Sequence, residues 1–69
     1  MDYKINIVSS ATGTVYATIH RVKDGNITNR AMYRHFDGLF SSLETNFKSA
    51  NKWAKKTIAV LEKYEVHND

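Results

Sequence analysis

The stretch Ser49–Glu65 carries the clearest helical pattern in this chain of 69 residues. Apolar and small side chains recur in it at steps of three and four, which is the spacing of one stripe along an α-helix. The stripe consists of Ala50, Trp53, Ala54, Thr57, Ile58, Leu61 and Tyr64. The lysines and Glu62 fall outside this stripe, and the hydroxyl of Ser49 is suited to cap the first turn. The pattern predicts an amphipathic helix.

Two strands are predicted before it. Apolar and polar residues alternate in Asp2–Ser9 and again in Thr14–Lys23, and alternation with period two is typical of a half-buried strand. A short loop that contains Gly13 separates the two strands, so an antiparallel hairpin is expected. Asp24-Gly25 then supplies a second turn signal.

Residues 26–47 allow two interpretations. In the first, Ile27–Phe36 is a third strand, Asp37-Gly38 is a turn, and Leu39–Phe47 is a fourth or irregular strand before a helix that starts at Ser49. In the second, Thr28 caps a helix that ends at Gly38. The segment Ser41-Ser42-Leu43-Glu44 is then a capping box, and the last helix begins near Ser42.

We favour the sheet interpretation, which predicts an α+β fold. A small antiparallel sheet of three to four strands, with the N-terminal hairpin as its firmest part, packs against the C-terminal amphipathic helix. The alternative is a ββαα arrangement of one hairpin and two helices. We expect one domain over 1–69, with 66–69 as a frayed tail. The predicted core is Ile5, Ile7, Val15, Ala17, Ile19, Leu43, Phe47, Ala54, Ile58 and Leu61.

Composition narrows the class of protein. Hydrophobic residues make up 42% of the chain, which is unlike a disordered segment. The absence of cysteine excludes disulfides and cysteine-ligated zinc, so self-association is the remaining way to add buried area. No apolar run reaches the roughly 20 residues needed to cross a bilayer, and the N-terminus lacks a signal-peptide pattern. We therefore expect a cytoplasmic protein with no membrane partner. If a bacteriophage encodes the chain, the expected compartment is the cytoplasm of its host.

The sequence does not predict an enzyme. His20, His35 and His67 lack metal-ligand spacing, and the carboxylates are not paired for acid–base chemistry. The three glycines are isolated, so no phosphate-binding loop is present. A domain of this size also has little room for a ligand pocket. We expect no catalytic residues, no metal, no cofactor and no small-molecule substrate.

Two clusters are candidates for contact with a macromolecule. The first interleaves arginines with aromatic residues, which are enriched at protein interfaces, and comprises Arg30, Tyr33, Arg34, His35 and Phe36. On a regular strand, Arg30, Met32, Arg34 and Phe36 would share one face. The second is a basic patch on the predicted helix, comprising Lys48, Lys52, Lys55 and Lys56. Lysine rather than arginine favours loose attraction to phosphates or to an acidic surface.

The resulting expectation is a non-catalytic binding module, a small inhibitor or adaptor that binds another protein. In size and architecture the chain is similar to the single-domain inhibitors that bacteriophages encode against host or defence machinery. The alternative is a weak, largely nonspecific nucleic-acid-binding protein that uses the lysine patch; the formal charge of +3 is compatible with either partner. A homodimer or other oligomerising subunit also stays open.

Overall fold

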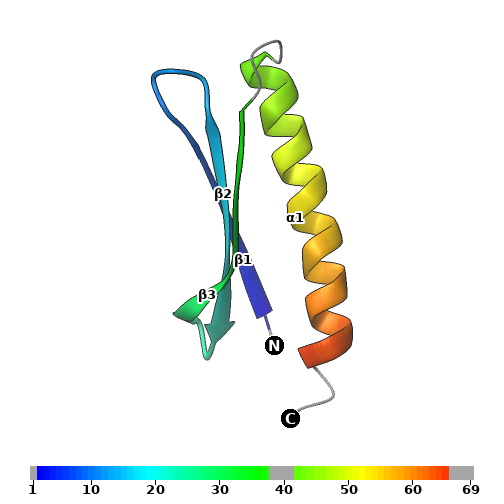
Figure 1. Cartoon of the computed structure of the whole chain (residues 1–69). Coiled ribbons are helices and arrows are strands. Elements are labelled where there is room, and N and C mark those ends of the chain that lie inside the picture. Colours follow the sequence, from blue (N-terminus) through cyan, green and yellow to red (C-terminus); the bar gives the residue numbers. More distant parts are fainter. Residues whose placement is uncertain (1, 38–41, 66–69) are drawn as a thin grey trace.

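The computed structural model describes residues 2–37 and 42–65. Three strands, β1 (Asp2–Ser9), β2 (Val15–Lys23) and β3 (Asn26–Phe36), form one antiparallel sheet in the order β1-β2-β3. Within these two ranges one helix, α1 (Leu43–Glu65), follows them (Figure 1). The prediction of an α+β fold, with a small antiparallel sheet and a C-terminal helix, is confirmed.

Both hairpin turns form where the sequence signals them. Between β1 and β2, the Ser10 N–H donates to the Thr14 carbonyl at 2.8 Å, and Gly13 takes a φ of 91°. Between β2 and β3, Asp24 and Gly25 have φ angles of 54° and 81°. Two successive positive φ angles define the type I′ turn, whose twist matches that of the adjoining strands. The Asp-Gly pair therefore sets the register of β2 against β3.

The helix starts earlier than Ser49, near the position given by the second interpretation. The Ser42 hydroxyl accepts the Thr45 N–H at 3.1 Å and so caps the first turn. The prediction that residues 43–47 belong to a fourth strand is wrong; residues 39–41 lie outside the described part of the chain. Glu44 pairs with Lys48 at 3.3 Å, and Ser41, which begins the predicted capping box, lies outside the described residues. The helical stripe extends back through Phe47 and Asn46, and the cap favours the longer helix.

The other half of the second interpretation is wrong. Residues 26–36 form a strand rather than a capped helix, because every part of this segment finds pairing partners along β2. The aromatic residues of its second half suit a pleated surface, and the Asp-Gly turn brings that surface alongside β2. The fold therefore takes its third strand from one interpretation and its helix start from the other.

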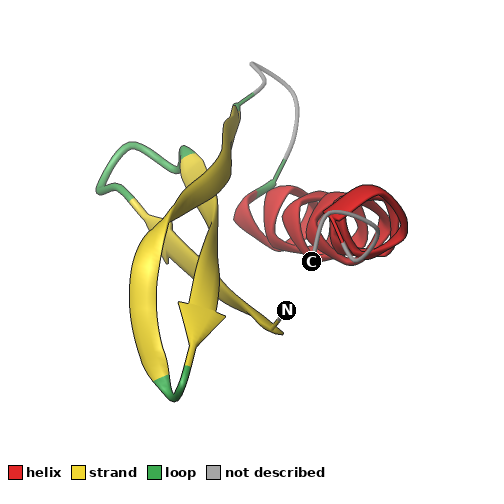
Figure 2. Cartoon of the chain, turned by 90° about the horizontal axis from the view of Figure 1, so that it is seen from below, coloured by secondary structure: helices red, strands yellow, loops and turns green. Residues whose placement is uncertain are grey.

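The core lies between the middle strand and the helix, which covers one face of the sheet only (Figure 2). Val15, Ala17 and Ile19 of β2 are fully buried, as are Ala50 and Ala54 of α1, and Ala50 packs in one cluster with Val15 and Ala17. Alanine at these helical positions lets the helix axis approach the sheet closely. Of the other predicted core residues, Leu43 is 44% exposed because it lies in the first turn, and the rest are half-buried: Ile5, Ile7, Phe47, Ile58 and Leu61.

Replacing Ser42 by alanine is expected to lower the free energy of unfolding by about 0.5–2 kcal/mol, because the Thr45 N–H loses its acceptor. Urea denaturation followed by circular dichroism measures this loss. Ser49→Ala is the matched control: Ser49 lies inside the helix, where alanine is the better helix former, so stability should stay equal or rise slightly. A larger loss from Ser49→Ala than from Ser42→Ala would contradict the observed helix start.

Candidate interaction surface

Two β-bulges in β3 decide which side chains reach each face of the sheet. His20 pairs with Arg30 and Ile19 pairs with Met32, so Ala31 is an extra residue between them. A second irregularity lies between the pairs of Arg21 and Val22. One inserted residue reverses the alternation on one side of it. Arg30 therefore lies on the face opposite Met32, and the prediction that these two share a face is wrong.

The face of the sheet turned away from α1 is covered by no other described element (Figures 1 and 2). The pairing of the strands arranges its side chains in four transverse rows, each with one residue from each strand. We call the nine residues of the first three rows the open sheet face: Val8, Tyr16 and His35 in the first row; Asn6, Thr18 and Tyr33 in the second; Lys4, His20 and Arg30 in the third. The fourth row, on the same side of the sheet, consists of Asp2, Val22 and Ile27.

A chain of ring contacts runs across this face. The guanidinium carbon of Arg30 lies 5.4 Å from the centroid of the Tyr33 ring, within cation–π range. The Tyr33 ring stacks at 26° on the Tyr16 ring, with 6.4 Å between centroids, and Tyr16 meets His35 at the same separation. These contacts hold one cation and three rings in place on a rigid sheet, while Tyr33 remains 46% exposed.

Arg34 and Phe36 do not join this chain. The Phe36 ring packs edge-on against Trp53 of the helix, with centroids 5.9 Å apart, and belongs to the border of the hydrophobic core. The Arg34 guanidinium lies 4.8 Å from the centroid of Phe36, also on the helix side. Of the five residues predicted for a protein interface, the structure brings Arg30, Tyr33 and His35 together on one face and separates the other two.

Tyr16 was missed as a site residue. Alternation in the second predicted strand already sets it opposite Val15 and Ala17, so its orientation was available from the sequence. The neighbours of Tyr16 on β3 could not be deduced from the sequence, because they depend on the register of β2 against β3. Tyr16 contacts both Tyr33 and His35, and it therefore joins the pair of Arg30 and Tyr33 to His35 in one cluster.

The formal charges within the three rows of the open sheet face are positive. Its three rows contain Lys4 and Arg30 together with two histidines, and none of the nine residues carries a carboxylate. The one acidic residue within the three strands is Asp2, which lies on the same side of the sheet in the fourth row, beside Val22. A partner that brings carboxylates or other anions to this face meets complementary charge.

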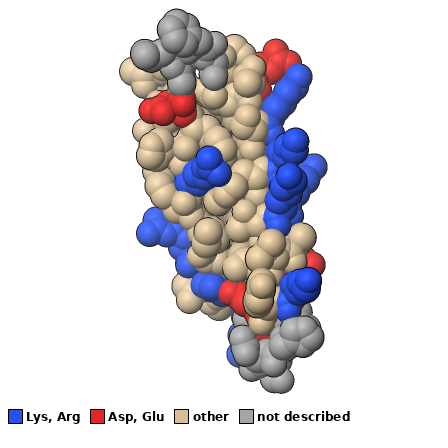
Figure 3. Space-filling view, turned by 45° about the vertical axis from the view of Figure 1, so that its right-hand side comes forward, with Lys and Arg blue, Asp and Glu red and all other residues tan. Residues whose placement is uncertain are grey.

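The predicted lysine patch lies on the far side of the helix. Lys48, Lys52, Lys55 and Lys56 are all exposed, and the helical repeat sets them roughly opposite the buried alanines. Figure 3, which turns the helix toward the viewer, shows a column of basic side chains. We call these four residues the lysine face. Because it and the open sheet face point in opposite directions, one flat partner contacts only one of them.

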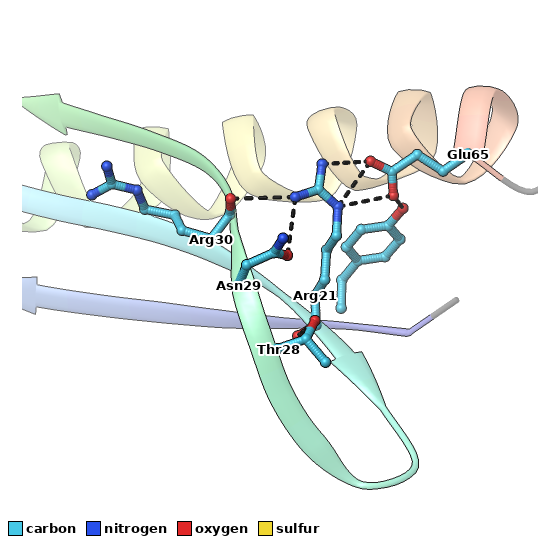
Figure 4. Close-up of polar contacts among 6 residues, drawn as sticks. Arg21, Thr28, Asn29, Arg30 and Glu65 are labelled. Carbon is cyan, nitrogen blue, oxygen red and sulfur yellow. Dashed lines mark hydrogen bonds and ion pairs between the residues drawn. The ribbon is translucent and has the colours of Figure 1, made fainter. Parts of the chain in front are cut away.

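Arg21 ties the end of the helix to the sheet, and no sequence pattern pointed to it (Figure 4). Its Nη2 and Nε donate to Oε1 of Glu65 at 2.7 and 3.0 Å, and the Tyr3 hydroxyl donates to the same carboxylate. Its Nη1 donates to Asn29 Oδ1 at 3.2 Å and to the Arg30 carbonyl at 3.3 Å. Arg21 therefore connects α1 with the bulged part of β3 that aims Arg30 at the open sheet face.

The network shifts the titration of its members. The hydrogen bonds from Arg21 and then from Tyr3 lower the pKa of the Glu65 carboxyl, because both stabilise the charged form. Burial, with the hydrogen bond to Glu65, raises the pKa of the Tyr3 hydroxyl to about 12. At neutral pH the carboxylate is ionised and the phenol protonated, which is the state that the hydrogen bonds require.

The described residues offer no further chemical centre. Within 2–37 and 42–65, no three His, Asp or Glu side chains gather in a way that could hold a metal ion. Over the same ranges, no helix has the length and apolar character needed to cross a membrane. Comparison with family models, with curated proteins and with solved structures found no match to this chain.

Proposed function

We propose that this chain is a non-catalytic binding module that attaches to another protein through its open sheet face. The observation that carries the proposal is the continuous contact from Arg30 through Tyr33 and Tyr16 to His35 on a sheet face that no described element covers. Tyrosine and arginine dominate the binding energy of protein interfaces when they lie on a rigid support. Their prior ordering reduces the entropy lost on binding.

A binding module of this size acts by occupying a surface. The favoured variant of the proposal is a small inhibitor or adaptor, of the kind that phages direct against host or defence proteins. Its support is the small size of the domain and the presence of one ordered contact face. Attachment of a rigid domain to a partner's working surface blocks that surface without any chemistry.

The test removes two exposed members of the cluster, Arg30 and Tyr33. The double variant Arg30→Ala, Tyr33→Ala is expected to lose affinity for the captured protein by about tenfold or more, since hot-spot side chains each contribute over about 1 kcal/mol. Capture from a bacterial lysate followed by mass spectrometry identifies the partner, and titration calorimetry with the purified partner measures the loss.

The matched control is Lys56→Ala, Tyr64→Ala, which removes a cation and an exposed tyrosine from the helix. It should bind as the unchanged chain does. Equal affinity for the Arg30, Tyr33 variant and this control would overturn the open sheet face as the site.

The second candidate is nucleic-acid binding through the lysine face, favoured by the exposure of four cations on one helix side. Titration calorimetry also separates protein binding from nucleic-acid binding. Binding of a nucleic acid should fall by orders of magnitude between about 50 and 200 mM salt, and charge reversal of Lys52, Lys55 and Lys56 to glutamate should abolish it. A protein interface centred on tyrosine tolerates both changes better.

A further inference from the structure

The two outer edges of the sheet are built differently. β3 carries two register shifts and the cations Arg30 and Arg34, and both features discourage another strand from pairing with it. β1 pairs with β2 in unbroken register from Asp2 to Ser9, and its only cation is Lys4. Within the described residues nothing pairs with the outer edge of β1. It is therefore the edge open to a further strand.

Apolar side chains accompany this edge on both faces. Val8 is 51% exposed on the open sheet face, and Ile5 and Ile7 are half-buried on the helix side. Among the described residues the fully buried core consists of five, so a domain of this size gains much from further burial. A strand placed against β1 would cover what the helix leaves uncovered of Ile5 and Ile7.

The size of the open sheet face points to the occupant. Three strands at about 4.8 Å spacing and eight residues at about 3.3 Å give a projected area of roughly 380 Å². A stable protein interface covers about 800 Å² on each partner. That figure is accessible surface, which exceeds the projected area of a face covered by side chains; two copies joined edge to edge double the projected area to roughly 760 Å² and so enlarge the surface that one partner can cover.

We propose that the occupant is a second copy of this chain, paired antiparallel through β1. A twofold axis perpendicular to the sheet joins the two sheets into one of six strands. Both open sheet faces then lie on the same side and both helices on the other. The area argument rests on the proposed function. The unbroken register of β1 and the incomplete burial of its apolar residues do not depend on it.

Charge and hydrophobicity favour a twofold axis that passes near Asn6. In this register Lys4 lies opposite Val8 of the second copy, and the two Lys4 side chains stay apart. Ile5 lies opposite Ile7 of the second copy on the helix side, so that two half-buried residues complete each other's burial.

Sedimentation equilibrium of the purified chain, from micromolar to submillimolar concentration, tests the proposal. The unchanged chain should sediment as a dimer at the upper end of this range. Val8→Lys places a lysine opposite Lys4 of the second copy and should weaken dimerisation by tenfold or more. Ile27→Lys is the matched control, because Ile27 is 52% exposed on the other edge strand, and it should dimerise as before. A monomer throughout, or equal dissociation of both variants, overturns the proposal.

The lack of cysteine permits a second readout. The variants Lys4→Cys, Asn6→Cys and Val8→Cys are oxidised in separate samples, and Asn6→Cys, which lies nearest the twofold axis, should form an interchain disulfide most efficiently. Both experiments use the free chain without a partner protein, so their outcome does not depend on whether the proposed function is right. A monomer whose Arg30, Tyr33 variant still loses its protein partner would overturn the dimer and leave the binding site in place.

Discussion

Replacing Ile19 by alanine is expected to lower the free energy of unfolding by about 2–5 kcal/mol, which is most of the stability that a domain of this size has. Ile19 is fully buried at the centre of the middle strand, where it pairs with Ile5 and Met32. The substitution leaves a cavity, and few buried neighbours are present that could move to fill it. Urea denaturation followed by circular dichroism measures the change, with the midpoint as the readout.

The matched control is Ile27→Ala, the same substitution at a residue of β3 that is 52% exposed. Its cost should stay below about 1 kcal/mol, because little apolar area is returned to water. Ile58→Ala should fall between the two, since Ile58 is half-buried on the flank of the helix. A loss at Ile19 no greater than that at Ile27 would show that the helix does not pack on β2.

The sheet was predictable because its strands alternate with period two and its turns carry glycine at positions of positive φ. The alternation alone puts Val15, Ala17 and Ile19 on one face of a strand, and all three are buried beneath the helix. The start of the helix was harder, because Ser42 and Ser49 are both competent caps and only one can be used. The choice depends on how far the apolar stripe stays in contact with the sheet, which is a tertiary property.

The candidate site was predictable only in part. The bulge at Ala31 adds a residue that no local pattern announces, and it moves Arg30 to the opposite face from Met32. The Tyr16 ring lies in a different strand from Tyr33, so their stacking depends on register. Arg21 and Glu65 are 44 residues apart, and their contact requires the helix to end over the sheet. These three features depend on how one strand or helix lies against another, and the pattern within a single strand or helix does not contain that information.

The contact between Arg21 and the Arg30 carbonyl links stability to the site. The bulge at Ala31 interrupts the regular ladder next to Arg30, and Arg21 donates to the Arg30 carbonyl while it holds Glu65. Loosening of the last helical turn would therefore release the support beneath Arg30. The open sheet face depends in this way on a helix that lies on the other side of the sheet.

Glu65→Gln is expected to cost about 1–2 kcal/mol at neutral pH, because the charge-assisted hydrogen bonds from Arg21 are lost at side chains that are 19–26% exposed. Glu44→Gln is the control. Glu44 pairs with Lys48 while both side chains are more than three-quarters exposed, and its loss should cost under about 0.5 kcal/mol. Urea titrations of both variants measure the two losses, and equal losses would contradict a structural role for Glu65.

The same network predicts how stability depends on pH at both ends of the range. Because folding lowers the pKa of Glu65, the unfolded chain binds the extra proton, and this contribution is lost as pH falls below about 4.3 toward the folded pKa. Folding raises the pKa of Tyr3 to about 12, so its contribution is complete below about 10 and is lost as pH rises through 12. The stability difference between the unchanged chain and Glu65→Gln should therefore shrink in acid, and that of Tyr3→Phe should shrink in alkali. Urea midpoints across pH give both curves, and a difference independent of pH in either variant would show that its hydrogen bond to the network does not form.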